Sequence, residues 1–345
     1  MLRHRTPGRV LAAAVSATAA LAVGLGGIPG TAAPGSSAPA VRLQPGSLPR
    51  GPDPAIPYVR GSTIVDGPRR IVLDADNAFL LGVSGDDYVV WASTGGRRTQ
   101  VWRVTPAGAV RVLLRAPEAF NAVLSADGDR IALPRTRVDA RETTVTVHDA
   151  VTGKIEETTT FTGFATVLDL DGDEAVVGTL DPDKTLLWHV PSGMREKIAG
   201  RRGYAADLAA DRLAVLTGDP FRGGCSVVST LDEPSQPLSR SCTERVYAFA
   251  PGGARMALVD LLTDGLGPSR VTVRRVGGRE VASYDAPLYF GMVTWETSRA
   301  LLLETNGPKR AALVRCRGTD CERASKLGRT PEVRPVAHRF TLAAP

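Results

Sequence analysis

Short apolar runs separated by turn residues recur along most of this chain. The clearest example, from Phe120 to Gly163, has two apolar runs joined by the turn Asp127-Gly128, then a stretch from Thr144 to His148 that alternates between polar and apolar residues, and finally a polar stretch. Two apolar runs around an Asp-Gly turn predict a β-hairpin, and strict alternation predicts a half-buried strand. The unit therefore predicts four consecutive antiparallel strands.

Weaker copies of this unit recur about every 42 residues. Successive units begin at Asn77, Phe120, Phe164, Tyr204, Val246 and Leu288. Four antiparallel strands repeated at a fixed period are typical of the blades of a β-propeller. We therefore predict an all-β chain whose fold class is the β-propeller of four-stranded antiparallel blades.

The residues that flank the six units predict how the ring closes. Residues 58–74 have the pattern of a short hairpin, and residues 332–342 that of one strand. An open ring would expose two strand edges, which proteins generally avoid. We therefore predict seven blades, the last one assembled from both ends of the chain. The alternative is a ring of six blades in which the N-terminal hairpin only covers an edge.

Particular hairpins resemble those of known propellers. Residues 123–132 (VLSADGDRIA) and 248–257 (AFAPGGARMA) resemble the inner hairpin of TolB-like and WD-repeat propellers, and residues 147–154 (VHDAVTGK) resemble their outer hairpin. His148-Asp149 stands where WD repeats have Trp-Asp, so the chain is more similar to the TolB-like group of secreted bacterial proteins. The resemblance covers residues 58 to about 340, and it implies a fold without implying an activity.

The chain before the repeats has a different composition. Three arginines precede an uncharged stretch at 10–28, and small residues follow it. This order predicts a secretory signal peptide over 1–32, with a retained membrane anchor as the alternative. Residues 33–57 are rich in Pro, Gly, Ser and Ala, and we expect them to form a disordered linker that packs on nothing. The single propeller domain is then expected over 58–342.

The charge balance narrows the possible partners. The formal net charge is +6, and three of the basic residues lie in the predicted signal peptide. So small an excess argues against a nucleic-acid partner. We expect a monomer that is secreted or held in the extracytoplasmic cell envelope, with no membrane span after signal cleavage.

The four cysteines predict two disulfides, because an exported chain meets an oxidising compartment. Cys225 and Cys242 are placed symmetrically about one predicted turn, and Cys316 and Cys321 flank a shorter one. Crosswise pairing would join blades that are separated by a whole blade, whereas a disulfide needs Cα atoms within about 7 Å. We therefore predict the pairs Cys225–Cys242 and Cys316–Cys321.

Familiar catalytic and metal-binding motifs are missing from the sequence. It has no Gly-x-Ser-x-Gly elbow, no His-Glu-x-x-His, no Walker loop and no dinucleotide-binding fingerprint. Residues 169–174 (DLDGDE) resemble the start of a calcium loop, but they coincide with the hairpin turn of every other unit. We therefore predict no metal site, no cofactor and no catalytic residue.

The face of the ring where the inner strands begin is the expected place for a ligand, because residues there converge on the axis from every blade. The positions on this face are Asn77, Glu118, Asn121, Arg245, Tyr247 and Tyr289. Their mixture of polar and aromatic side chains suits recognition better than covalent catalysis. We therefore expect a non-catalytic exported module that binds a protein, a peptide or an envelope glycan.

The alternative function is enzymatic. A propeller hydrolase or lyase would need an acid and a base that meet in the axial funnel, and carboxylates can fill both roles. The carboxylates that the repeat places near the axis are Glu118, Asp169 and Asp207.

Overall fold

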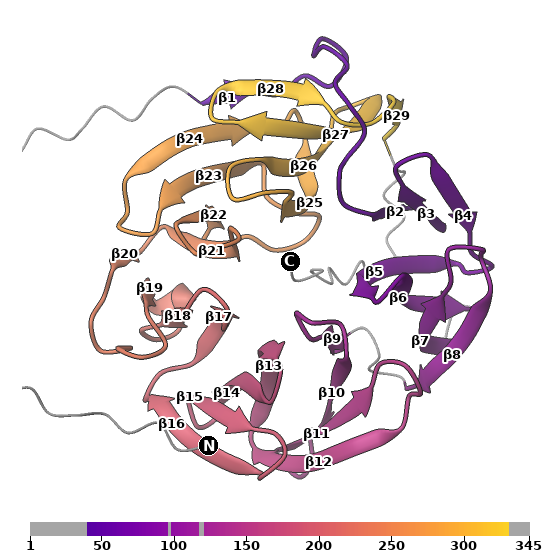
Figure 1. The fold of residues 1–345 in the computed structure, drawn as a ribbon. Helices are drawn as coiled ribbons and strands as arrows, with labels where there is room; N and C mark the ends of the chain where they lie inside the picture. The colour runs from indigo at the N-terminus through magenta and orange to yellow at the C-terminus, as the bar shows by residue number, and fades with distance from the viewer. Residues whose placement is uncertain (1–39, 96–97, 117–120, 331–345) are drawn as a thin grey trace, which may run out of the picture. The chain divides into compact units, whose positions relative to one another are not determined.

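The computed structural model describes residues 40–95, 98–116 and 121–330. The chain divides into two compact units, residues 1–37 and 38–345, and the described residues all belong to the second. Strands make up nearly all of the regular structure among these residues, which also include a 3-10 turn at Pro220–Arg222. They form seven antiparallel sheets arranged as blades in a ring (Figure 1). The predicted all-β propeller is confirmed.

Six blades follow the six predicted units, each from its innermost to its outermost strand in chain order. Their strands are β5 (Asn77–Ser84), β6 (Asp87–Thr94), β7 (Arg98–Val104) and β8 (Val110–Arg115); β9 (Val123–Leu124), β10 (Arg130–Arg137), β11 (Glu142–Asp149) and β12 (Ile155–Thr162); β13 (Phe164–Asp171), β14 (Glu174–Leu180), β15 (Lys184–His189) and β16 (Met194–Ala199); β17 (Gly203–Asp207), β18 (Arg212–Leu216), β19 (Ser226–Ser229) and β20 (Ser239–Ser241); β21 (Glu244–Phe249), β22 (Arg255–Asp260), β23 (Arg270–Arg275) and β24 (Glu280–Asp285); and β25 (Tyr289–Trp295), β26 (Leu301–Asn306), β27 (Arg310–Arg317) and β28 (Asp320–Arg323), with β29 (Gly328–Arg329) also paired to β27.

The turn at Asp127-Gly128 shows why the repeated unit folds as a hairpin. Gly128 has a φ of 78°, and a Cβ atom there would lie 2.4 Å from the carbonyl oxygen of Val83 in the preceding blade. Only glycine meets both conditions without strain. The Asp127 carboxylate accepts a hydrogen bond from the backbone N–H of Asp129, which closes the turn.

The core lies between the blades, where the faces of neighbouring sheets pack together. Phe161 on β12 meets Trp188 on β15 edge to face, with ring centroids 5.8 Å apart. The remainder is mostly Val, Leu, Ile and Ala from the middle strands, which are buried on both faces. Such strands read as continuous apolar runs, and this is the pattern that the sequence shows.

The seventh blade contains β2 (Tyr58–Arg60), β3 (Thr63–Asp66) and β4 (Arg69–Val72) among the described residues. Ile64 packs against the blade that begins with β5, and Val65 packs against the blade that begins with β25. The hairpin therefore fills a full blade position between both neighbours, so the ring has seven blades and the six-blade alternative is wrong. The C-terminal strand expected at 332–342 lies outside the described residues.

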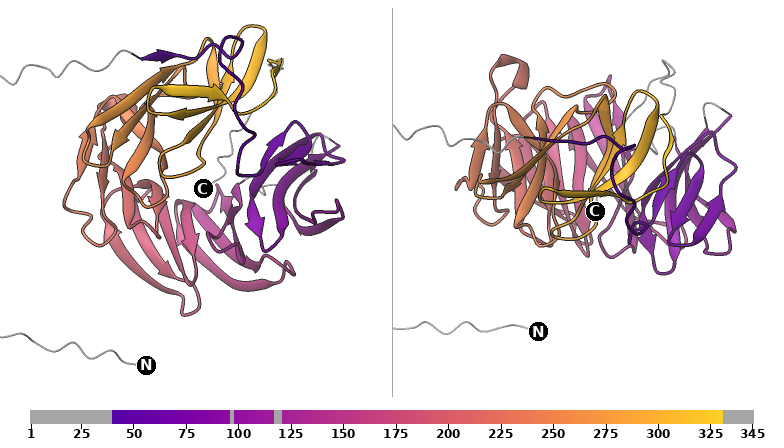
Figure 2. Two further views of the ribbon diagram at one scale, coloured as in Figure 1. Left: turned by 45° about the horizontal axis from the view of Figure 1, so that its top comes forward. Right: turned by 90° about the horizontal axis from the view of Figure 1, so that it is seen from above.

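The segment before β2 packs on the ring, so the disordered linker expected at 33–57 is wrong for its described part, while residues 33–39 lie outside the described residues. Its first strand, β1 (Val41–Arg42), pairs in parallel with the outermost strand β24, and Leu43 is fully buried. Farther along, the Gly51 N–H donates to the carbonyl oxygen of Arg323, and the Arg323 N–H donates to the carbonyl oxygen of Pro49. Figure 2 shows this segment (indigo) running along the last blade (yellow) in both views. We call residues 41–55 the strap.

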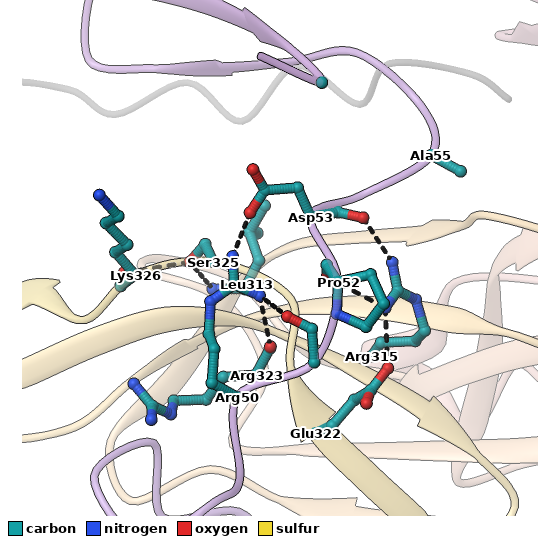
Figure 3. Close-up of polar contacts among 12 residues, drawn as sticks. Arg50, Pro52, Asp53, Ala55, Leu313, Arg315, Glu322, Arg323, Ser325 and Lys326 are labelled. Atoms are coloured by element: carbon teal, nitrogen blue, oxygen red, sulfur yellow. Dashed lines mark hydrogen bonds and ion pairs between the residues drawn. The ribbon is translucent and has the colours of Figure 1, made fainter.

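A buried arginine fastens the strap. The Arg315 guanidinium forms ion pairs with Glu296, at 2.5 Å, and with Glu322, at 2.8 Å, and it donates hydrogen bonds to the carbonyl oxygens of Pro52 and Asp53 (Figure 3). The side chains of Arg315 and Glu296 are only 4% and 2% exposed. The composition of the strap resembles that of disordered chains, so the order comes from partners far away in the sequence.

Both predicted disulfides are confirmed. Cys225 is bonded to Cys242 and Cys316 to Cys321, and each bond joins the two outer strands of one blade. Two disulfides indicate an oxidising, extracytoplasmic environment. Within residues 40–330, where described, no helix is long and apolar enough to cross a membrane. The predicted signal peptide at 1–32 lies outside the described residues.

Candidate functional site

The sequence-predicted ligand residues are spread over several blades. Asn77 begins β5 and its side-chain amide donates to the hydroxyl of Ser93. Asn121 is exposed just before β9, and Glu118 lies outside the described residues. These positions are therefore not brought together with the others by any described contact.

Arg245 and Tyr247 lie in the first half of β21, and Tyr289 begins the neighbouring inner strand β25. Burial raises the pKa of the Tyr247 hydroxyl to about 12, with Arg245 lowering it and Glu304 raising it. Burial and then Glu304 also raise the pKa of Tyr289. The two tyrosines thus share the charged neighbour Glu304, which the sequence analysis had not singled out.

At the other end of the inner strands, three aspartates of two adjacent blades gather near the axis. Asp169 and Asp171 lie among the last three residues of β13, and Asp207 is the last residue of β17. The Asp169 Oδ2 accepts a hydrogen bond of 2.6 Å from the backbone N–H of Leu208, the residue that follows Asp207. This bond links the Asp169 carboxylate to the residue next to Asp207 across the blade boundary.

The surroundings make Asp169 unusual among the acidic residues. Burial raises its pKa to about 6, against an ordinary value of 3.8, and the nearby carboxylates of Asp207 and Asp171 add to the increase. The N–H groups of Leu208 and Leu170 act in the opposite direction but do not cancel it. A carboxyl with such a pKa holds a proton at mildly acidic pH, which an ordinary aspartate does not.

The pKa of Asp207 is also raised above its ordinary value. Burial raises its pKa and Asp171 adds to the effect, while the N–H of Ala210 and the charge of Arg212 lower it. The Ala210 N–H donates to Asp207 Oδ1 at 2.8 Å, which fixes the carboxylate on the β17–β18 turn. A protonated Asp169 beside an ionised Asp207 is an arrangement able to donate and accept protons in one reaction.

Residues 169–174, which resemble the start of a calcium loop, form the end of β13, a turn and the start of β14. Among the residues described, no group of three or more His, Cys, Asp or Glu side chains is placed to hold a metal ion. The carboxylate of Asp169 instead accepts backbone N–H groups.

Sequence reasoning identified Asp169 and Asp207 from their places in the repeat, but it could not identify their burial. The neighbour that links them is a backbone amide, that of Leu208, and a backbone group leaves no mark on residue type. The only available signal was that both positions fall close to the end of the predicted inner strand in consecutive units.

Comparison with known proteins finds similarity in structure only. No protein-family model matches the sequence, and no curated protein matches it. Among solved structures, the acylaminoacyl peptidase of Pyrococcus horikoshii has a TM-score of 0.56 at 15% identity, over 76% of this chain and 47% of the peptidase. One of two prolyl endopeptidases described together has a TM-score of 0.51 at 14% identity, over 72% of this chain and 42% of that protein.

The β-propeller domain of the Trilobed protease from Pyrococcus furiosus is similar over its whole length, with a TM-score of 0.53 at 9% identity over 84% of this chain. This chain thus spans about half the length of the two larger peptidases and all of the isolated propeller domain. At such identities the similarity establishes the fold. These structural neighbours are peptidases or a protease propeller domain and not binding modules, so the expectation of a non-catalytic binding module is not upheld, and the hydrolase alternative is taken up as a proposal below.

Proposed function

We propose that this protein is a propeller hydrolase in which Asp169 and Asp207 act as the acid and base pair. The observation that carries the proposal is the half-buried Asp169 carboxyl, which lies near a second carboxylate, that of Asp207, and whose pKa is raised to about 6. Perturbed carboxyls of this kind concentrate at functional sites. The peptidases among the structural neighbours favour an amide or ester bond as the bond that is cleaved.

The two roles follow from the different environments. Asp207 accepts a proton from a water molecule, whose oxygen attacks the carbonyl carbon of the substrate. The protonated Asp169 donates its proton to the leaving nitrogen or oxygen as the bond to the carbon breaks. After the reaction Asp207 carries a proton and Asp169 carries none. Proton exchange with solvent then restores the starting state.

Two substitutions and a matched control test the proposal. The variants Asp169→Asn and Asp207→Asn keep the side-chain size but remove the titrating group, and each is expected to lower kcat/KM by roughly 10²- to 10⁴-fold on a panel of peptide and ester substrates. Asp86→Asn is the control, because Asp86 is an exposed aspartate at the equivalent turn of another blade. Full activity of either test variant, or an inactive wild-type protein on the whole panel, would refute the proposal.

We also propose that the protein acts after export, following removal of residues 1–32, and that its repeat is of the TolB-like kind. The two disulfides and the composition of the first 32 residues support export. N-terminal sequencing of the protein from the culture medium or the envelope fraction is expected to begin near Ala33. A sequence that begins at Met1 would contradict cleavage.

A further inference from the structure

We propose that the cleft between the blades that begin with β17 and β21 binds an extended peptide of another protein, in which an acidic residue precedes an aliphatic one. The proposal is independent of hydrolysis. It rests on the strap, which occupies the corresponding place one blade later and so shows what kind of segment the space between two blades accepts.

The strap enters the space between the blades that begin with β21 and β25. Its strand β1 adds to the outer edge of β24, where Arg42 pairs with Asp285, and the N–H of Leu43 donates to the Asp285 carbonyl oxygen at 2.9 Å. The Leu43 side chain is fully buried among apolar side chains of both blades. The chain thus binds a part of itself by strand addition to an outer edge, followed by insertion of one leucine.

A cleft of about 140 Å³ lies at the equivalent place one blade earlier in the ring (Figure 1). Its walls come from the outer strands β19 and β20 of one blade and from β22 and β23 of the next, and the side chains of Val228, Met256 and Leu258 line its inner part. Its volume is close to the roughly 150 Å³ of an engineered core cavity that binds a small apolar ligand. One aliphatic side chain therefore fits into it.

The edge that adjoins this cleft is open. β20 is the outermost strand of its sheet, and within the described part of the chain no strand pairs with its outer edge, whereas β24 carries β1 there. An edge strand presents backbone N–H and C=O groups to an added strand. The hydroxyls of Ser239 on β20 and of Thr243 after it also line the cleft, and a hydroxyl can both donate and accept hydrogen bonds.

The charges of the two walls differ. Arg240 of β20 lines the cleft, and among the described residues it forms no ion pair; its guanidinium donates one weak hydrogen bond, to the Cys225 sulfur at 3.4 Å. Arg274 on the opposite wall forms ion pairs with Glu244, at 2.9 Å, and with Glu280, at 3.3 Å. Both carboxylates of this wall are thus engaged, and the edge strand keeps one cation for a partner.

Comparison of the two edges indicates which peptide is accepted. On β24 the residue beside the strap is Asp285, and the strap places Arg42 there. On β20 the edge carries Arg240 instead. Opposite charges on paired strands attract and like charges repel, so the cleft favours an acidic residue and disfavours the strap's own arginine.

Three capped peptides test the site by isothermal titration of the mature full chain. The first has the sequence of residues 40–46, AVRLQPG, with Arg42→Asp; the second has the unaltered sequence; the third combines Arg42→Asp with Leu43→Ser. We expect the first to bind with a dissociation constant of about 1 mM or tighter. The second is expected to bind about fivefold more weakly because of its charge, and the third at least about tenfold more weakly because it lacks the apolar side chain.

Variants tie the binding to the cleft. Arg240→Glu is expected to reverse the order of the first two peptides, and Ser239→Phe, which fills the cleft, to weaken the first peptide at least about tenfold. Arg222→Glu is the matched control and should leave the order unchanged, because the side chain of Arg222 is 87% exposed and lies outside the cleft. No binding of the first peptide at about 10 mM, equal binding of the first and third, or an unchanged order in Arg240→Glu would overturn the proposal.

Discussion

At the scale of single residues, two carboxyl groups removed from solvent to different degrees, Glu296 and Asp169, affect stability with opposite dependence on pH. The Glu296 carboxyl is paired with Arg315, whereas among the described residues the Asp169 carboxyl accepts hydrogen bonds from backbone N–H groups and forms no ion pair. Burial alone would raise the pKa of Glu296, but hydrogen bonds from Arg315 and from the Ala55 N–H bring it below the ordinary value. Glu296 is therefore stabilising when ionised, whereas Asp169 is stabilising when protonated.

Replacing Arg315 tests the fastening of the strap. In Arg315→Met the buried Glu296 loses its partner and the strap loses two hydrogen bonds, so we expect the free energy of unfolding to fall by about 3–5 kcal/mol. Arg317→Met is the control, because the side chain of Arg317 is 58% exposed. Denaturant unfolding measures both. If Arg315→Met and Arg317→Met had the same free energy of unfolding, the ion pair of Arg315 with Glu296 would contribute nothing to stability.

The pH dependence of stability tests Asp169. Its folded pKa lies above the ordinary value, so its stabilising contribution is complete below pH 3.8 and is lost as the pH rises to about 6. We expect this loss to amount to about 1–3 kcal/mol and to be absent from Asp169→Asn. The control Asp86→Asn should retain it. Unfolding curves between pH 3.5 and 7.5 that fall in parallel for Asp169→Asn and the wild type would contradict this assignment.

At the scale of strands and blades, the sequence predicted what depends on local pattern. The Asp-Gly turns, the alternation in β11 and the symmetric cysteines are local features, and the structure follows them. The strap was missed because its partners, such as Arg315 and β24, lie more than 200 residues away and its own composition is that of a linker. Burial of Asp169 was missed for the same reason, since it depends on the next blade.

Closure of the seventh blade can be tested by deletion. One edge of β2 pairs with β3, and in the described part of the chain its other edge has no strand partner. We propose that residues 332–342 pair there, as the sequence predicts. Removing residues 331–345 is then expected to lower the melting temperature by roughly 5 °C or more. Removing residues 1–32 is the control and should leave it unchanged; equal melting of both truncated proteins would argue against closure by the C-terminal segment.

At the scale of the whole molecule, the ring presents two different ends. The aspartate pair lies where the inner strands finish, and the arginine with its two tyrosines lies where they start. The residues at each end lie on neighbouring inner strands, so the packing between blades determines their positions. The fold alone does not determine chemistry, since propellers host many functions. The activity must therefore be decided at the aspartates themselves.

The pH–rate profile of the wild-type protein tests the proposed hydrolase most directly. If protonated Asp169 is the acid, kcat/KM is expected to fall as the pH rises through about 6, and to fall again at low pH as Asp207 takes up a proton. The limb near pH 6 should disappear in Asp169→Asn, while Asp86→Asn keeps it. A profile that is flat from pH 4 to 8, or a limb near pH 6 that persists in Asp169→Asn, would contradict the account.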